Sequence, residues 1–157
     1  MMTTKSSSMS KSTVRRYGYC LLLYFAYQLR KILMDLLRLT ARIATSKYNP
    51  TKRYQIACIA KRADGTIVYS INHCEPNRQW AHHAEARVLR KCDVGATLYI
   101  ARVLKRDRKE WALSSPCPRC RKLIEHKKIK EVFYTIAPNE YGCWKPGEST
   151  EVKRTIK

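Results

Sequence analysis

Four side chains in two short motifs have the types and the spacing that metal-assisted chemistry needs. HHAEARVLRKC, at residues 82–92, puts His83 and Glu85 two positions apart at the start of a predicted helix. SSPCPRC then puts Cys117 and Cys120 at the spacing that lets two thiolates bind one tetrahedral metal ion. One histidine and two cysteines would hold Zn²⁺ and leave its fourth position open to water. Glu85 would act on that water as a general base, without binding the metal.

Each motif alone has a less specific interpretation. His83 by itself would be a helix cap or a surface histidine, because H-A-E recurs by chance in charged helices. The cysteine pair by itself could be half of a structural zinc knuckle that Cys143 or Cys92 completes, which would leave Glu85 without a role. The two motifs in this order favour the site with the general base, because H-x-E followed by P-C-x-x-C is the known signature of zinc-dependent nucleobase deaminases.

The composition is that of one globular domain with an excess of positive charge. The 157 residues are 45% hydrophobic, which is enough to bury a core. Lysine and arginine number 32 against 12 acidic residues, and the formal net charge of +20 favours partners that carry phosphate or another anion. Seven cysteines without the dense spacing of a secreted scaffold favour a reducing intracellular compartment, with the cytoplasm as the first choice.

The N-terminal residues differ in composition from the rest of the chain. We predict a disordered basic tail at residues 1–16, an additional apolar helix at 17–33 and a zinc-dependent domain at 34–157. The apolar run from Tyr17 to Leu29 is shorter than the roughly 20 residues of a membrane-spanning helix, so no membrane partner is expected. An organellar targeting segment, a membrane-surface helix and an over-long start before Met34 are the alternatives.

Hydrophobic periodicity and turn residues predict the elements that must position the two motifs. Apolar residues at three- and four-residue spacing predict a helix from about 29 to 45, which Pro50 prevents from continuing. The predicted strands are 53–60, 66–72, 95–103 and 130–136, with extended structure resuming at 111–115, and the motif helices are 81–92 and 117–128. The segment after Ala137 is predicted to be rich in loops. This order of elements is typical of a mixed, layered α/β domain.

Beyond the two motifs, the chain resembles the cytidine and deoxycytidylate deaminase family over residues 34–136. CIAKRADGTIVYSIN looks like the first hairpin of that family, HAEARVLRKCDVGATLYIARV like its metal helix and third strand, and SSPCPRCRKLIEHKKIKEVFYT like its cysteine helix and next strand. The resemblance implies a three-layer α-β-α domain with a mixed sheet of roughly five strands. It also implies zinc-dependent hydrolytic deamination of cytosine to uracil in a nucleoside or nucleotide, with a deoxycytidylate-like substrate.

The resemblance further implies roles for residues that spacing alone does not identify. Asn72 matches an asparagine that contacts the sugar in relatives, and Tyr134 resembles an aromatic residue of the substrate pocket. The backbone N–H of Ala84 would meet the base carbonyl, and the carbonyl of Ser115 would meet the leaving amino group. Glu85 would take a proton from the attacking water and pass it to N3 of cytosine and to the departing ammonia. For Asn72 and Tyr134, a turn cap and a core aromatic are the alternatives.

The positive charge leaves a second substrate class open. When the six cations of residues 1–34 are subtracted from +20, residues 35–157 keep +14, which exceeds what one substrate phosphate needs. A deaminase of single-stranded DNA or RNA, acting on cytosine or adenine, is therefore the alternative. A catalytically idle nucleic-acid-binding module is the third interpretation. The candidate contacts to phosphates or bases are Lys105, Arg106, Arg108, Lys109, Arg119, Arg121, Lys122, Trp111 and Trp144.

Two further expectations concern metal content and assembly. His73, Cys74 and His82 fall in one loop and could form a second zinc site, as some deoxycytidylate deaminases have, with exposed loop residues as the alternative. KRDRKEW, at 105–111, lengthens the segment before the cysteine helix and lies near the expected substrate entrance, which leaves the substrate open. A homo-oligomer is expected because relatives commonly associate through helices.

Overall fold

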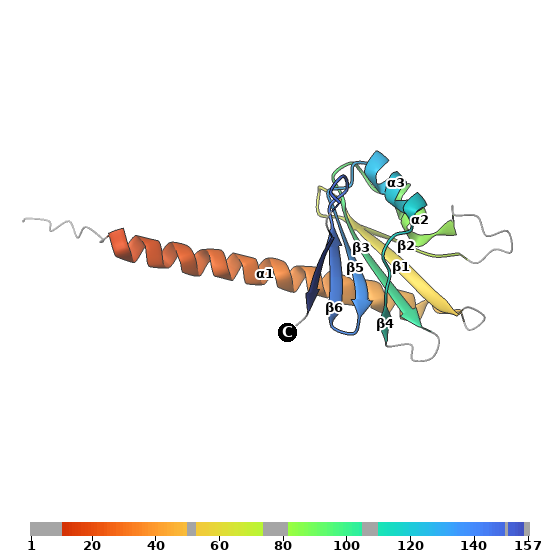
Figure 1. The fold of residues 1–157 in the computed structure, drawn as a ribbon, viewed down its shortest axis with the longest axis horizontal. Coiled ribbons are helices and arrows are strands. Elements are labelled where there is room, and N and C mark those ends of the chain that lie inside the picture. The colour runs from red at the N-terminus through yellow and green to blue at the C-terminus, as the bar shows by residue number, and fades with distance from the viewer. Residues whose placement is uncertain (1–10, 50–52, 74–81, 105–109, 150, 156–157) are drawn as a thin grey trace, which may run out of the picture. The chain divides into compact units, whose positions relative to one another are not determined.

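The computed structural model describes residues 11–49, 53–73, 82–104, 110–149 and 151–155. The chain divides into two compact units, Met1–Asp35 and Leu36–Lys157, which are considered separately. The second unit contains the whole sheet and the helices α2 and α3 (Figure 1). Over these ranges, no helix has both the length and the apolar character that crossing a membrane requires.

Helix α1 (Lys11–Ser46) begins in the first unit and ends in the second. In its C-terminal part, the buried residues Leu37, Thr40, Ala41 and Ala44 recur at three- and four-residue spacing, so the helix has one buried face there. The predicted end near residue 45 agrees with the observed end at Ser46. The start at Lys11 differs from the prediction, because residues 11–16 are helical and not part of a disordered tail. The rest of that tail lies outside the described residues, and the domain limits at 17–33 and 34–157 stay predictions.

Seven strands form one mixed sheet in the order β2-β1-β3-β5-β6-β7, with β4 paired to β3. The elements after α1 are β1 (Tyr54–Lys61), β2 (Ile67–Ile71), α2 (Ala84–Leu89), β3 (Thr97–Leu104), β4 (Trp111–Ala112), α3 (Pro118–His126), β5 (Glu131–Ala137), β6 (Glu140–Trp144) and β7 (Glu151–Thr155). Strands β3 and β5 run parallel, and the other pairs of neighbours are antiparallel. The antiparallel strands β1 and β2 form the predicted hairpin. Gly65, in the turn between these strands, has a φ of 86°.

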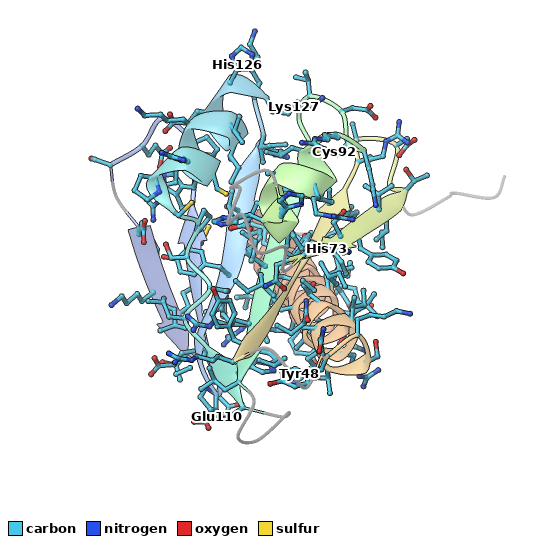
Figure 2. All side chains as sticks on the ribbon, turned by 90° about the vertical axis from the view of Figure 1, so that its right-hand side faces the viewer. Tyr48, His73, Cys92, Glu110, His126 and Lys127 are labelled. Atoms are coloured by element: carbon cyan, nitrogen blue, oxygen red, sulfur yellow. The ribbon has the colours of Figure 1, made fainter. Side chains whose placement is uncertain are left out.

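The two faces of the sheet are covered by different helices, because successive residues of a strand point to opposite faces. Ile100 of β3 packs with Ile124 of α3 in the larger core, which also includes residues of α2. Val103 of the same strand packs with Ala44 of α1 in a smaller core. Cys92, labelled beside α2 in Figure 2, belongs to the larger core. The predicted three-layer α-β-α fold is confirmed, with seven strands in place of about five.

The segment after Ala137 forms two strands, so the prediction of a loop-rich tail is wrong. Strand β6 turns back on β5 at Asn139, whose φ of 65° is a conformation that asparagine tolerates. Strand β7 then returns on β6 after Gly147, whose φ is 88°. Trp144 is only 3% exposed and joins the larger core. The prediction that Trp144 stacks on bases is therefore also wrong.

Gly142 of β6 lies directly against the ring of Tyr134, its partner on β5. A β-carbon at position 142 would lie far inside van der Waals contact with that ring, so only glycine leaves room for it. Tyr134 is 1% exposed. The hairpin of β6 and β7 is therefore packed against a residue that the sequence places in the candidate site.

Candidate metal centre

The two motifs meet because helices α2 and α3 each lead into one of the two parallel strands. Helix α2 precedes β3 and helix α3 precedes β5, so both helices begin at the same end of the sheet. His83 is the N-cap residue of α2, and Cys117 is the N-cap residue of α3. Both have extended backbone, and Pro118 occupies the first turn of α3, where its missing N–H costs nothing. The fold thus brings together residues that are far apart in the sequence.

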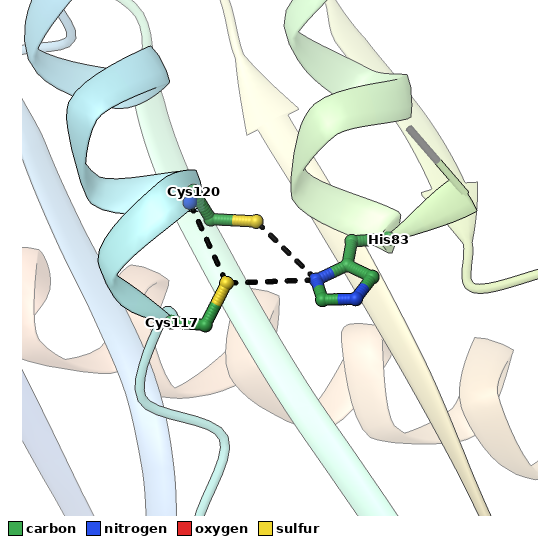
Figure 3. A group of neighbouring side chains, drawn as sticks. All are labelled: His83, Cys117 and Cys120. Carbon is green, nitrogen blue, oxygen red and sulfur yellow. Dashed lines mark hydrogen bonds between the residues drawn. The ribbon is translucent and has the colours of Figure 1, made fainter. Parts of the chain in front are cut away.

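The side chains of His83, Cys117 and Cys120 form one compact group (Figure 3). The Nδ1 atom of His83 lies 3.7 Å from the sulfur of Cys117 and 3.5 Å from the sulfur of Cys120. A tetrahedral Zn²⁺ with ordinary bond lengths to nitrogen and sulfur needs about 3.6 Å between these two ligand atoms. Two thiolates and one imidazole are also the donors that Zn²⁺ favours. The group therefore fits Zn²⁺ in both donor chemistry and spacing.

Burial sets the acid–base properties around this group. Burial, and after it the nearby Glu85 carboxylate and Cys117, raises the pKa of the Cys120 thiol far above its usual value. A thiolate at this position is therefore costly unless a cation compensates it, as a bound divalent metal does.

Glu85 is 4% exposed, and desolvation raises the pKa of its carboxyl group. A backbone hydrogen bond, the nearby His83 and a hydrogen bond from the Cys120 thiol oppose this rise without cancelling it. Glu85 is thus a buried carboxyl group in direct contact with one of the metal-binding side chains. Its raised pKa makes it suited to hold and release a proton.

Comparison with known proteins connects this geometry to a family. The model of the cytidine and deoxycytidylate deaminase zinc-binding region matches residues 31–136. The chain belongs to this family. All three metal-binding side chains of the chain lie within the matched residues, and the predicted cofactor, Zn²⁺, is confirmed. No curated protein matches the chain.

A solved structure supports the same fold for this chain. The 1.6 Å crystal structure of cytidine deaminase from Burkholderia pseudomallei matches it with a TM-score of 0.52 and 16% sequence identity. The match covers 77% of this chain and 91% of the bacterial chain. At this low identity the likeness establishes the fold alone. Family and metal group together identify a zinc-dependent domain of the cytidine deaminase type.

Two of the predicted substrate residues have structural partners of their own. The side-chain oxygen of Asn72 accepts hydrogen bonds from the Ile56 backbone N–H at 2.8 Å and from the Gln55 amide. These bonds tie the residue after β2 to strand β1. The Ser115 hydroxyl accepts from the Arg121 guanidinium at 2.8 Å. These hydrogen bonds use neither the Asn72 amide N–H groups nor the Ser115 carbonyl. The substrate contacts of Asn72, Ser115 and Ala84 therefore stay predictions.

A polar network that the sequence did not reveal joins the C-terminal strand to the cysteine helix. The Tyr134 hydroxyl donates to the Glu151 carboxylate of β7, and the Arg121 guanidinium of α3 pairs with the same carboxylate. Arg121 also donates to the Pro116 carbonyl at 3.1 Å and to the Ser115 hydroxyl. These bonds hold the loop before α3, which carries the first cysteine ligand. Arg121, predicted to contact phosphates, thus has a structural role in this domain.

The remaining predicted nucleic-acid contacts are divided between exposed and undescribed positions. Lys105, Arg106, Arg108 and Lys109 lie outside the described residues. Arg119 and Lys122 are exposed on α3, and Trp111 is half-buried in β4. Their contacts with a substrate stay predictions.

The second zinc site also stays a prediction, because Cys74 lies outside the described residues. The rings of His73 and His82 are 6.5 Å apart between centroids, and the His73 N–H donates to the His82 carbonyl at 2.9 Å. Among the side chains that the structure describes, the one group of three metal-binding residues is the His83, Cys117 and Cys120 set.

Glu151→Gln is expected to lower the free energy of unfolding at neutral pH by about 1 kcal/mol, because the Arg121 pair is only partly buried. Burial alone would raise the pKa of the Glu151 carboxyl, but hydrogen bonds from Tyr134 and Arg121 hold it below its usual value of 4.5. A lowered pKa in the folded state adds stability above the unfolded pKa, and this stability is lost as the pH falls through the folded value.

The variant should therefore show a smaller loss of stability between pH 7 and pH 3 than the parent chain, as measured by urea unfolding. Glu148→Gln is a matched control, because Glu148 is exposed and its replacement removes the same charge. Equal acid sensitivity in the parent and in both variants would contradict the network.

Proposed function

We propose that the protein deaminates cytosine to uracil in a nucleoside or nucleotide, with a deoxycytidylate-like substrate, by zinc-dependent hydrolysis. The observation that carries the proposal is the position of Glu85. Its buried carboxyl group lies on the same helix start as His83 and in contact with Cys120. A structural zinc knuckle needs no such carboxyl group, whereas hydrolysis needs a general base beside the reacting water.

The proposed chemistry assigns each step to a residue of the chain. When bound, Zn²⁺ supplies Lewis-acid activation of water and a fixed positive charge. Glu85 takes the proton of the water that attacks C4 of cytosine. Glu85 then delivers that proton to N3. It next takes the proton of the hydroxyl group formed at C4 and passes it to the amino group, so that the C4–N bond breaks, ammonia leaves and the C4 carbonyl of uracil forms. Burial favours this relay, because it raises the pKa of the Glu85 carboxyl group and so strengthens its hold on the proton that it carries.

Binding groups for the base and sugar follow from the family resemblance. The Ala84 N–H at the first turn of α2 would donate to the base carbonyl, and the Ser115 carbonyl would accept from the amino group that leaves. Asn72 would offer its amide N–H groups to the sugar, since its side-chain oxygen is already bonded in the hairpin. Tyr134 would form part of the pocket wall.

Positive charge favours a polynucleotide substrate as the second candidate. Arg119 and Lys122 are exposed on the helix that starts at the metal group. Residues 35–157 carry a net charge of +14, which is the total of +20 less the six cations of residues 1–34. A basic surface next to the reacting base is what a deaminase of single strands uses to follow the backbone. An idle binding module is a third candidate, but it would have no use for Glu85.

A substrate panel tests these candidates. Zinc-loaded protein is incubated with deoxycytidine monophosphate, cytidine and single-stranded oligonucleotides that contain one cytosine or one adenine, and the deaminated base is quantified. The proposal expects the highest kcat/KM on the mononucleotide, with weak dependence on salt. Turnover of the oligonucleotides alone, falling steeply with salt as counterions compete, would transfer the assignment to the second candidate. If the protein bound the oligonucleotides but deaminated none of the substrates, the catalytically idle binding module would be the function that fits.

A further inference from the structure

Among the described residues, a pocket at the edge of the sheet is lined by positively charged side chains and by no acidic one. The pocket has a volume of about 350 Å³ and is lined by Lys47, Tyr69, Ser70, Ile71, Arg87 and Lys91. All six residues belong to the unit Leu36–Lys157. Three of the six side chains are cationic. The lining therefore attracts anions.

Two buried polar atoms of this lining have no hydrogen-bond partner among the described residues. They are the Ser70 hydroxyl oxygen and the Nε atom of Arg87. Ser70 is only 4% exposed, so bulk water does not serve its hydroxyl group. A buried polar group without a partner costs about 1–3 kcal/mol, and folded proteins usually satisfy such groups with protein, water or ligand atoms. The two atoms thus mark a place where a polar ligand would complete the structure.

Lys91 is held in position at the same pocket. Its Nζ atom donates to the Tyr69 carbonyl at 3.0 Å, and an ammonium group has two further N–H donors. Lys47 adds a third positive charge from the end of α1. Donors from β2, from α2 and from the residues after α2 therefore surround one small volume.

We propose that this pocket binds the phosphomonoester group of a small ligand such as a nucleotide, with Arg87, Lys91 and Ser70 as donors. A phosphomonoester carries about −1.5 to −2 charges at neutral pH, whereas a carboxylate or a phosphodiester carries one. Three cations match the larger charge. The ring of Tyr69, a residue that is 47% exposed, offers the rest of the ligand an apolar surface.

This pocket is separate from the metal group, and the proposal goes beyond the deaminase reaction. Glu85 and Arg87 are two residues apart on α2, so their side chains leave the helix about 160° apart. One helix therefore supplies the general base on one side and the phosphate donor on the other. The binding of a phosphate ligand at this pocket does not depend on catalysis at the metal group.

The test uses zinc-loaded full-length protein and probes without cytosine, so that the deaminase reaction does not interfere. Thymidine 5′-monophosphate and inorganic phosphate are titrated while the arginine Nε–H resonances are followed by NMR, with the Arg87 signal assigned by its loss in Arg87→Gln. Both probes should shift that signal. Lys91→Gln should raise the Kd of the nucleotide roughly tenfold, and Ser70→Ala should raise it about threefold, because each substitution removes one hydrogen-bond donor.

Lys130→Gln is the matched control. Lys130 is exposed and does not line the pocket, and its substitution removes the same positive charge as Lys91→Gln. Equal Kd values for this control, Lys91→Gln and Ser70→Ala would overturn the proposal, as would an Arg87 signal that does not move. A thymidine oligonucleotide without terminal phosphates should bind more weakly than the monophosphate. If it binds as tightly, the site follows a polynucleotide backbone and the phosphomonoester assignment fails. Zinc content and circular dichroism verify that each variant is folded.

Discussion

Glu85→Gln is expected to keep the zinc content of the protein and to lower kcat for cytosine deamination by about 10²- to 10⁴-fold, the usual contribution of a general acid–base group. Glutamine has nearly the size of glutamate, so the packing around this 4% exposed side chain is preserved. Its amide cannot take a proton from water at neutral pH. The free energy of unfolding should hold steady, because the native environment already disfavours the charged carboxylate.

Three measurements on one preparation check this prediction: zinc by elemental analysis, turnover by uracil formation and stability by urea unfolding. Glu125→Gln is the control for the loss of a carboxylate, because Glu125 is exposed on α3. A Glu85→Gln protein with parental turnover would exclude Glu85 as the general base. A protein that also lost its zinc would instead place Glu85 among the groups that hold the metal.

Cys117→Ala is expected to weaken zinc binding by about a thousandfold. Structural Zn²⁺ binds with roughly 12 kcal/mol, so losing one of three protein ligands costs about 4 kcal/mol. Thermal stability should fall toward that of the chelated parent protein, because zinc that binds only the folded state stabilises it. Adding a chelator to Cys117→Ala should change its melting temperature little, whereas the parent protein should lose several degrees.

Cys143→Ala separates this zinc site from the structural knuckle that the sequence also allowed. The Cys143 thiol donates to the Glu131 carboxylate at 3.1 Å, and burial together with this bond raises its pKa to about 12. Among the described side chains, the metal-binding group consists of His83, Cys117 and Cys120 and does not include Cys143. Cys143→Ala should therefore keep its zinc, and loss of zinc in this variant would restore the knuckle interpretation.

The parts of the protein that were predictable from sequence are those with a short-range signal. The spacing of Cys117 and Cys120, and the H-x-E motif around His83, were sufficient to predict the metal group, because ligand chemistry restricts the residue types and their order. Strands β1, β2, β3 and β5 followed from runs of β-branched and aromatic residues. The end of α1 followed from its apolar period and the nearby Pro50.

What was missed depends on contacts between segments that are distant in the sequence. The prediction of loops rested on Pro138, Gly142, Pro146 and Gly147. Pro138 lies in the turn between β5 and β6, and Pro146 and Gly147 lie in the turn between β6 and β7. Gly142 lets strand β6 pass close to the ring of Tyr134. No local pattern indicates that Glu151 meets a tyrosine of β5 and an arginine of α3. The pocket at the edge of the sheet is also invisible to motif analysis, because its residues come from β2, from α2 and from the positions just after α1 and α2, and they share no spacing.

The two outer strands of the sheet differ in how they avoid pairing with a strand of another molecule. Strand β7 exposes Lys153 and Arg154, whose charges repel a second copy of the same edge. Strand β2 has no charged residue, but the Lys91 ammonium group occupies the outward carbonyl of Tyr69. Removal of Lys91 would therefore uncover a backbone carbonyl on an uncharged edge strand. Among the described residues, the β2 edge is thus guarded against pairing by a side chain from outside the sheet, and the β7 edge by two charges within the strand.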